Sequence, residues 1–455
     1  MNFLENNKKL FFIYLTVVFV TGVIYIALSD GFYFIDEGAQ YLTNRNVWVN
    51  PELSLSPWAR FGRAWLYAPA AFFGHKATKI MAYAIFVLCL AVTYKAARKL
   101  NLKYAEYVIL FTGFQPVFFD LSYSVMAEMP AAFLLILSFW LFLEKRYAQS
   151  MLSASLILIF RYELILYVMI LIFFFIKEKK YKESLIAITG PLIWWGWSAI
   201  LTGDVFWLKQ AFQEFSKLAK HKEGTELYHY FILTPVIFGF LISFFAIAGS
   251  FNKKLFEKRN YIILLSTIGW TYFINIITSV KYFSFSGSVG DWRYLTPVAP
   301  FFGIFAVAGF GWFSEKTGIL TVKFGAFLIA LIVLTNCFII AKPHNYNDYE
   351  KTVFILFDKA KQKNPDFKIL TNDFALFVTL ELPFKNSEKI DRLDEITLNT
   401  LERGYILWEP YNCEGKVNNS GFSLNALRQG PQYRFCDSVL YDKKFWMYLI
   451  EKTKI

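Results

Sequence analysis

The chain of 455 residues is 56% hydrophobic and 20% aromatic, and only 18% of its residues are charged. Soluble proteins are closer to a quarter charged, so this composition argues against a soluble enzyme and for a membrane protein. The net charge of +12 does not indicate a nucleic-acid partner, because the basic residues form short clusters between apolar stretches, as membrane insertion requires. The clusters are Lys95, Arg98, Lys99 and Lys103; Lys145 and Arg146; Lys177, Lys179, Lys180 and Lys182; and Lys253, Lys254, Lys258 and Arg259.

Eleven apolar stretches predict an all-α polytopic membrane protein. They cover residues 10–29, 77–94, 107–123, 129–143, 151–160, 164–176, 184–201, 231–248, 262–280, 295–313 and 319–341. With the N-terminus in the cytoplasm, every basic cluster falls on the cytoplasmic side and the polar C-terminal region lies outside. This arrangement suits a multi-pass protein of a bacterial inner (plasma) membrane whose active site faces outward.

The stretch from 151 to 176 allows two interpretations, because Arg161 and Glu163 fall near its middle. A single span would bury both charges, at about 2.5–3.5 kcal/mol each on insertion scales. It would also move the basic cluster that follows to the outer side. Two short helices with the charges at their connecting tip avoid both problems, so we expect a helical hairpin whose tip lies in a polar vestibule.

Two long loops, at residues 30–76 and 202–230, are expected outside the membrane. Within the second, residues 206–220 predict an amphipathic helix that lies on the membrane surface. We divide the chain into a transmembrane module at 1–341 and a small extracytoplasmic α/β domain at 342–455.

The C-terminal domain contains one predicted helix at 349–363 and two predicted strands at 368–371 and 404–408. Cys413 and Cys436 both lie in this domain. Extracytoplasmic cysteines can be oxidised, so we expect them to form a disulfide.

Three acidic residues lie where predicted spans meet the outer face. Asp36 and Glu37 follow the first span, and Glu128 precedes Pro130 at the outer end of the fourth. A carboxylate at this face can take the proton of an acceptor hydroxyl. The simpler interpretations are a solvated acidic pair in a loop and, for Glu128, an acid favoured by the dipole of a helix N-terminus. Residue type alone leaves both open.

Basic and aromatic residues gather at the same face. Arg161 lies at the hairpin tip beside Tyr162 and Glu163, and Arg293 follows Asp291 at the start of the tenth span. An arginine there can bind a phosphate through two parallel hydrogen bonds, or it can pair internally with the nearby acid. The loop before the eighth span adds His221, Tyr228, His229 and Tyr230. Interfacial preference alone would also explain these tyrosines.

The order and spacing of four short motifs resemble the GT-C glycosyltransferases, and most closely the dolichyl-phosphate-mannose-dependent mannosyltransferases of glycosyltransferase family 22. The motifs are the acidic pair Asp36-Glu37 with Gln40; Arg63-Ala-Trp-Leu-Tyr-Ala-Pro69; the loop with Gly224, Thr225, His229, Tyr230 and Phe231; and Arg293-Tyr294-Leu295-Thr296-Pro297. The resemblance extends to about residue 313. The sequence departs from the family where Phe34-Ile35 replaces His-Pro, and where Val289-Gly290-Asp291-Trp292 stands at the place of His-Lys-Glu.

The resemblance implies an inverting transferase that moves a hexose, with mannose as the candidate, from a polyprenyl- or dolichyl-phosphate donor to a glycan, lipid or protein acceptor. Asp36, or else Glu37, would be the catalytic base, and Glu128 is a third catalytic candidate. The donor phosphate would be bound by Arg293, Arg161 and His229. The substrate-binding candidates are Arg63, His221, Tyr230, Tyr294 and Asp291.

The sequence favours a lipid-linked donor over a sugar nucleotide, because it has neither a Gly-rich phosphate loop nor a D-x-D motif. It also lacks C-x-x-C and Cys/His metal spacings, so we expect no metal and no cofactor. Two other classes share these features. A lipid-linked oligosaccharide flippase or transporter more often shows internal repeats, and an O-antigen ligase or polymerase would use diphosphate-linked donors.

Overall fold

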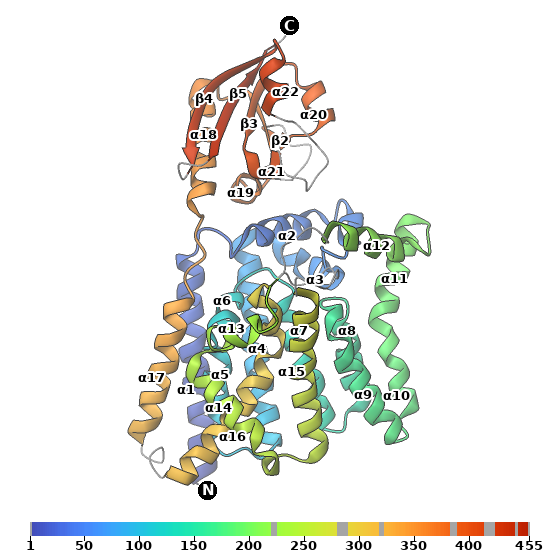
Figure 1. Ribbon diagram of the computed structural model, residues 1–455, viewed down its shortest axis with the longest axis vertical. Coiled ribbons are helices and arrows are strands. Elements are labelled where there is room, and N and C mark those ends of the chain that lie inside the picture. Colours follow the sequence, from blue (N-terminus) through green and yellow to red (C-terminus); the bar gives the residue numbers. More distant parts are fainter. Residues whose placement is uncertain are drawn as a thin grey trace.

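A helical bundle carries a small sheet domain at one end in the computed structural model (Figure 1). The model describes residues 2–219, 225–279, 290–317, 323–382, 389–413, 424–441 and 445–453. The helices of the first half are α1 (Asn2–Leu28), α2 (Ile35–Asn46), η1 (Pro51–Ser54), α3 (Phe61–Phe72), α4 (His75–Lys99), η2 (Ala105–Tyr107), α5 (Val108–Gly113), α6 (Pro116–Leu121), α7 (Glu128–Leu143), α8 (Tyr147–Ile157), η3 (Tyr162–Leu164) and α9 (Ile165–Lys177). The rest of the bundle comprises α10 (Tyr181–Leu185), η4 (Ile186–Ile188), α11 (Thr189–Thr202), α12 (Trp207–Ala219), α13 (His229–Phe238), α14 (Phe240–Phe251), η5 (Lys253–Leu255), α15 (Lys258–Ser279), η6 (Trp292–Val298), α16 (Ala299–Thr317) and α17 (Lys323–Ile340).

Five helices among the described residues are long and apolar enough to cross a membrane, and the bent pair α13–α14 would make a sixth. The five are Lys9–Leu28, His75–Lys99, Tyr181–Thr202, Lys258–Ser279 and Trp292–Lys316. The polytopic, helical membrane part is therefore confirmed. The number of eleven spans stays a prediction.

Two stretches predicted as single spans are broken in the structure. Residues 107–123 form α5 and α6, because Pro116 lacks an amide hydrogen and Gln115 before it is extended, with ψ 122°. The side-chain amide of Gln115 donates to the carbonyls of Phe111 and Ala299, both at 2.9 Å, so the break leaves these acceptors satisfied. Residues 231–248 bend by 111° at Gly239, whose φ of +89° is readily adopted only by glycine.

The stretch from 151 to 176 forms two short helices, α8 and α9, as predicted. The chain leaves the helical conformation at Arg161, where φ is −145°, and the single turn η3 follows. The predicted amphipathic helix also forms, as α12. Its position on a membrane surface remains a prediction.

The basic clusters lie together at one end of the bundle, which we call the basic end. Arg259 at the start of α15 pairs with Glu178 after α9, Lys99 lies 3.2 Å from Glu144, and Lys103 lies 3.1 Å from Glu315. The sheet domain lies at the opposite end (Figure 1). The distribution of charge along the bundle therefore has the asymmetry that the positive-inside rule describes.

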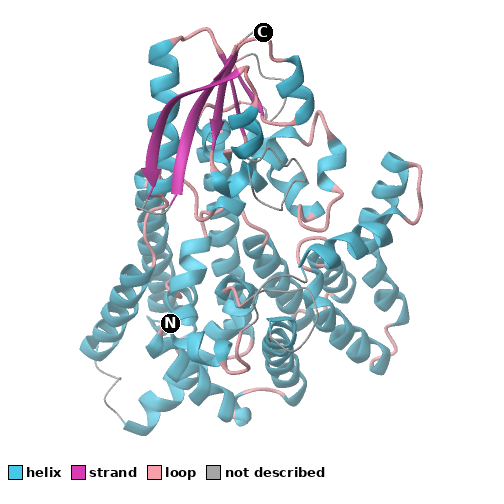
Figure 2. Ribbon diagram, turned by 45° about the horizontal axis from the view of Figure 1, so that its top comes forward, coloured by secondary structure: helices cyan, strands magenta, loops and turns pink. Residues whose placement is uncertain are grey.

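The C-terminal domain has a five-stranded mixed sheet with the order β2-β1-β3-β5-β4, covered by helices (Figure 2). The strands β1, β2 and β3 are parallel, and β3, β5 and β4 are successively antiparallel. The predicted helix and both predicted strands are confirmed, and three further strands were not predicted. The elements are α18 (Asp348–Lys363), β1 (Lys368–Thr371), α19 (Phe374–Thr379), β2 (Ile390–Arg392), α20 (Glu395–Thr400), β3 (Gly404–Trp408), α21 (Pro410–Cys413), α22 (Leu424–Gln429), β4 (Tyr433–Tyr441) and β5 (Phe445–Lys452).

The expected disulfide between Cys413 and Cys436 is wrong, because both are free thiols. Cys413 packs with Ile406 and Trp408 in the core on one face of the sheet. Cys436 packs against the core that contains Tyr405 on the other face. Successive residues of β3 point to opposite faces, so the sheet itself separates the two sulfur atoms.

We predict that unfolding of the purified protein without reductant, followed by alkylation, will find Cys413 and Cys436 both as thiols. Peptide mass spectrometry after labelling with and without reductant should give the same modified peptides. A pair of peptides that appears only after reduction would contradict the separation of the two residues by the sheet.

Candidate active site

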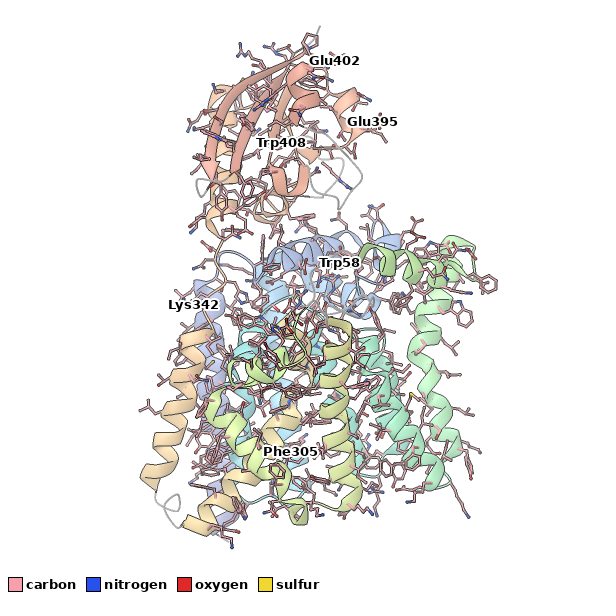
Figure 3. The ribbon with its side chains drawn as sticks, viewed as in Figure 1. Trp58, Phe305, Lys342, Glu395, Glu402 and Trp408 are labelled. Atoms are coloured by element: carbon pink, nitrogen blue, oxygen red, sulfur yellow. The ribbon has the colours of Figure 1, made fainter. Side chains whose placement is uncertain are left out.

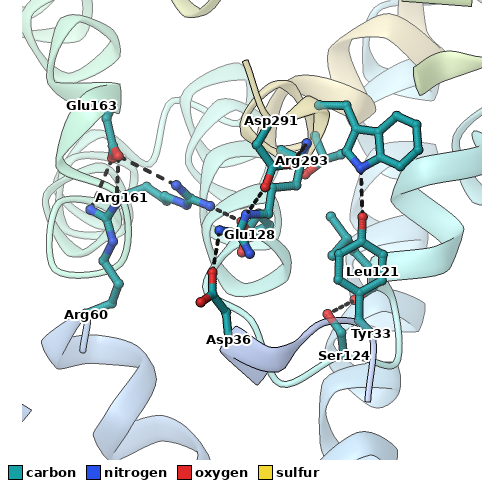
Figure 4. A network of polar contacts seen from close by, with 12 residues as sticks. Tyr33, Asp36, Arg60, Leu121, Ser124, Glu128, Arg161, Glu163, Asp291 and Arg293 are labelled. Carbon is teal, nitrogen blue, oxygen red and sulfur yellow. Dashed lines mark hydrogen bonds and ion pairs between the residues drawn. The ribbon is translucent and has the colours of Figure 1, made fainter. Parts of the chain in front are cut away.

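A chain of ion pairs lies where several helices begin at the domain end of the bundle (Figure 4). Arg293 is its centre. An Nη atom of Arg293 donates to Asp36 at 2.9 Å, and its Nε lies 3.0 Å from Asp291 and 3.7 Å from Glu128. Burial raises the pKa of Asp291, although the adjacent Arg293 opposes that shift. Asp36 keeps 29% of its side chain exposed, so it can reach a substrate.

The ion-pair chain continues away from Arg293 through the hairpin tip. Arg161 pairs with the same Glu128 oxygen that faces Arg293, and its other nitrogen lies 3.6 Å from Glu163. Glu163 in turn lies 2.7 Å from Arg60. The ring of Tyr294 covers Arg161, with the guanidinium carbon 4.5 Å from its centroid. These contacts connect four segments that are distant in sequence.

Local sequence explains why these side chains meet. Asp36 lies in the first turn of α2 and Glu128 is the first residue of α7, and carboxylates are stabilised at helix N-termini by unpaired amides and the helix dipole. The Asp291 side chain accepts a hydrogen bond from the Arg293 amide and so caps η6. Arg161 occupies the break before η3. Each of the three carboxylates thus sits at a helix N-terminus that favours an acid, and the arginines pair with these acids.

The formal charges of this region cancel. The arginines are Arg60, Arg63, Arg161 and Arg293, and the carboxylates are Asp36, Glu128, Glu163 and Asp291. Arg63 differs from the others: it is fully buried and donates to the carbonyl of Ala59 and to Asn44. Because the set is neutral, an added phosphate needs a spare donor or a further cation.

Arg293 offers such a donor, because its buried Nη1 has no hydrogen-bond partner among the described residues. A cavity of about 640 Å³ has Asp291, which contacts Arg293 in the ion-pair chain, in its wall. The wall also includes His229, Trp292, Lys342 and His344. Exposed Lys342 lies between the bundle and the C-terminal domain (Figure 3). No ion pair of Lys342 is found in the described part of the chain.

Glu37 points away from Asp36 and is completely buried. Its carboxylate accepts hydrogen bonds from the backbone amides of Tyr33 and Val125, and it lies 3.3 Å from Nε2 of His75. Burial alone would raise the pKa of Glu37, but the charge of Lys79 and the hydrogen bond from His75 outweigh it and lower the pKa to about 2. Of the two carboxylates, Asp36 is therefore the one that can meet a substrate, whereas Glu37 holds the start of α2 in place.

Glu37 belongs to a second polar group, which we call the Glu37 cluster: Glu37, His75, Lys79, Asp120 and His344. Lys79 donates to the Gly31 carbonyl at 2.6 Å, and Nε2 of His344 lies 3.1 Å from Asp120. Sequence reasoning missed four of these residues. The sequence did contain one signal for them. His75 and Lys79 lie at the start of an otherwise apolar span, and a charged group there needs a partner.

The structure places the other candidates as follows. Tyr230 is buried and donates to the Asp291 carbonyl at 3.2 Å, and Nε2 of His229 lies 2.8 Å from the Gly290 carbonyl oxygen. Both therefore hold the loop before Arg293. Tyr294 covers the arginines, and Arg63 has no exposed surface. His221 lies outside the described residues.

Comparison with known proteins adds the fold class. No family model matches the sequence, and no curated protein matches it. Two solved structures resemble it: ArnT from Cupriavidus metallidurans in the apo state, with a TM-score of 0.60, and the same protein bound to undecaprenyl phosphate, with a TM-score of 0.61. Each is 10% identical and covers 96% of this chain and 97% of its own. This likeness concerns the fold, and it confirms the GT-C fold predicted from the sequence.

We predict that Glu37→Gln destabilises the protein by on the order of 3 kcal/mol, as expected when one partner of a buried charged group is removed. Because folding lowers the pKa of Glu37, its carboxylate stabilises the fold fully above about pH 4.5, the pKa of this group in the unfolded chain. That stabilisation is lost as the pH falls from 4.5 toward about 2. Thermal unfolding in detergent should show the largest difference from wild type near neutral pH and a shrinking difference below pH 4.5. Equal unfolding temperatures at neutral pH would contradict the positioning role.

Proposed function

We propose that this protein is an inverting glycosyltransferase that moves a hexose from a polyprenyl-phosphate-linked donor to an acceptor hydroxyl. The observation that carries the proposal is the contact between Asp36 and Arg293, whose partner Asp291 lines the cavity. The two residues are far apart in the sequence. The carboxylate of Asp36 is a suitable proton acceptor, and the guanidinium of Arg293 is a suitable phosphate ligand. Their juxtaposition supplies both halves of a glycosyl transfer.

The donor phosphate is proposed to lie between Arg293 and Lys342. The free Nη1 of Arg293 provides a hydrogen-bond donor, and Lys342 on the cavity wall provides a positive charge that no described carboxylate neutralises. Of the ligands predicted from sequence, Arg161 is occupied by Glu128 and Glu163. His229 lines the cavity and can contribute there. A phosphate at Arg293 also competes with Asp36 for that guanidinium, which frees Asp36 for the acceptor.

The reaction follows from these positions. Asp36 takes the proton of the acceptor hydroxyl while the hydroxyl oxygen attacks the anomeric carbon from the face opposite the phosphate. The bond from the anomeric carbon to the phosphate oxygen breaks through an oxocarbenium-like state, as in other glycosyl transfers. The electron pair leaves with the polyprenyl phosphate, whose negative charge Arg293 and Lys342 stabilise. The product has inverted anomeric configuration.

The basic end of the bundle suggests that the site faces outward. By the positive-inside rule, the lysine- and arginine-rich end is cytoplasmic, so Asp36 and the C-terminal domain lie outside, in a bacterial inner (plasma) membrane. The complex of ArnT with undecaprenyl phosphate supports a lipid phosphate as ligand for this fold. The resemblance of the motifs to family 22 favours mannose as the hexose. A glycan, lipid or protein supplies the acceptor hydroxyl.

We predict that the purified protein transfers label from one member of a panel of polyprenyl-phosphate sugars. Asp36→Asn should lower turnover by about 10²–10⁴, the factor typical of a lost general base, while donor binding is retained. Lys342→Gln should weaken donor binding about tenfold, which corresponds to one lost charge-assisted hydrogen bond.

Lys76→Gln is the matched control, because Lys76 is an exposed lysine near the same end and is not part of the cavity wall. Its donor affinity and turnover should equal those of wild type. Unimpaired transfer by Asp36→Asn, with the same fold by circular dichroism, would exclude Asp36 as the base. Transfer only from diphosphate-linked donors would instead indicate a ligase or polymerase.

A further inference from the structure

The C-terminal domain touches the catalytic helix α2 through one carboxylate. Glu381 follows α19 and accepts hydrogen bonds from the hydroxyl of Tyr41 at 2.8 Å and from the amide of His75 at 3.1 Å. It also pairs with Arg45 in the last turn of α2. A single side chain thus binds α2 and the start of α4 at once.

An apolar contact surrounds this carboxylate. Phe32, Tyr41, Leu42 and Ala71 from the bundle share one buried core with Leu376, Phe377 and other residues of the C-terminal domain. Within this core, helix α19 of the C-terminal domain packs against helix α2 of the bundle. The two parts are therefore joined by a packed interface, and Glu381 adds a directional contact to it.

The backbone of Glu381 adopts a conformation that costs free energy. Its φ is +54°, in the left-handed region, directly after the end of α19. Glycine is the residue favoured at such a position after a helix, because other residues adopt it at a cost. The contacts of the Glu381 carboxylate help to offset this cost.

The contact leads by short steps to the proposed base. The amide of His75 is bound by Glu381 and its ring faces Glu37 at 3.3 Å. Glu37 accepts from the amide of Val125, three residues before Glu128. Asp36 and Arg45 lie in the first and last turns of the same 12-residue helix, which spans about 18 Å. A rigid helix of this length transmits a tilt at Arg45 to Asp36.

We propose that the C-terminal domain positions α2 for catalysis through Glu381, so that Asp36 keeps its place against Arg293 and the acceptor. Glu381 is then a positioning residue, since it acts through α2 and does not reach the reacting atoms. This inference rests on the proposed function. It gives the C-terminal domain a role in turnover beyond its own folding.

The experiment compares Glu381→Gln and Glu381→Gly with a control, Glu395→Gln. Glu395 is exposed on α20, on the far side of the C-terminal domain (Figure 3). The substitution Glu395→Gln therefore removes the same charge from the same domain. Each full-length variant is measured in detergent by hydrogen exchange of the α2 amides, by thermal unfolding, and by kcat and donor KM. Exchange does not depend on activity, so it tests the coupling even if the proposed reaction is wrong.

We expect both Glu381 variants to speed exchange in α2 about tenfold and to lower kcat about tenfold or more, with donor KM unchanged. Glu381→Gly should unfold at the wild-type temperature or above, because glycine relieves the left-handed strain. The control should match wild type in all three. Unchanged α2 exchange in Glu381→Gln, or a loss of unfolding temperature in Glu381→Gly that accompanies the kinetic change, would overturn the proposal.

Discussion

The architecture of the site depends on the requirement that a charge removed from water must be paired. Arg293 is mostly buried and contacts three carboxylates from three separate segments. Breaking a buried pair by removal of one partner costs about 3–5 kcal/mol, so Arg293 holds the starts of α2 and α7 and the segment before α16 in one place.

The same requirement explains why so many helices end near the site. A helix terminus exposes unpaired amides and so accepts carboxylates, and Asp36 and Glu128 occupy such positions. The breaks at Arg161 and at Gln115 interrupt two apolar stretches. Each break exposes backbone amides and carbonyls that an unbroken helix would pair internally. Irregular backbone at this depth is tolerated because protein groups satisfy it. The break at Arg161 thus places one arginine of the ion-pair chain at a helix end.

Sequence reasoning succeeded where local chemistry decided the outcome. The tip at Arg161 was predictable because two charges in one span are too costly, and the strands at Lys368–Thr371 and Gly404–Trp408 were predictable from β-branched and aromatic runs. The grouping of Asp36, Glu128 and Arg293 at one face also followed from topology. The fold class was predicted from motif order, and the structure bears it out.

Other features depended on contacts between distant segments and could not be predicted. Nothing local distinguishes Asp36 from Glu37, and only the burial of Glu37 against His75 separates their surroundings. The cysteines share a domain, but the sheet that divides them is visible only in three dimensions. Lys342 looks like one more lysine after a span. Its place in the wall of a cavity that five separate parts of the chain form is visible only in three dimensions.

The most direct test of this account is the structure of the protein with a bound polyprenyl-phosphate sugar. The account predicts that the phosphate lies within hydrogen-bond distance of Arg293 and Lys342, and that the Asp36 carboxylate has left Arg293 and faces the open side of the sugar. A phosphate bound elsewhere, with the contact between Asp36 and Arg293 intact, would contradict it.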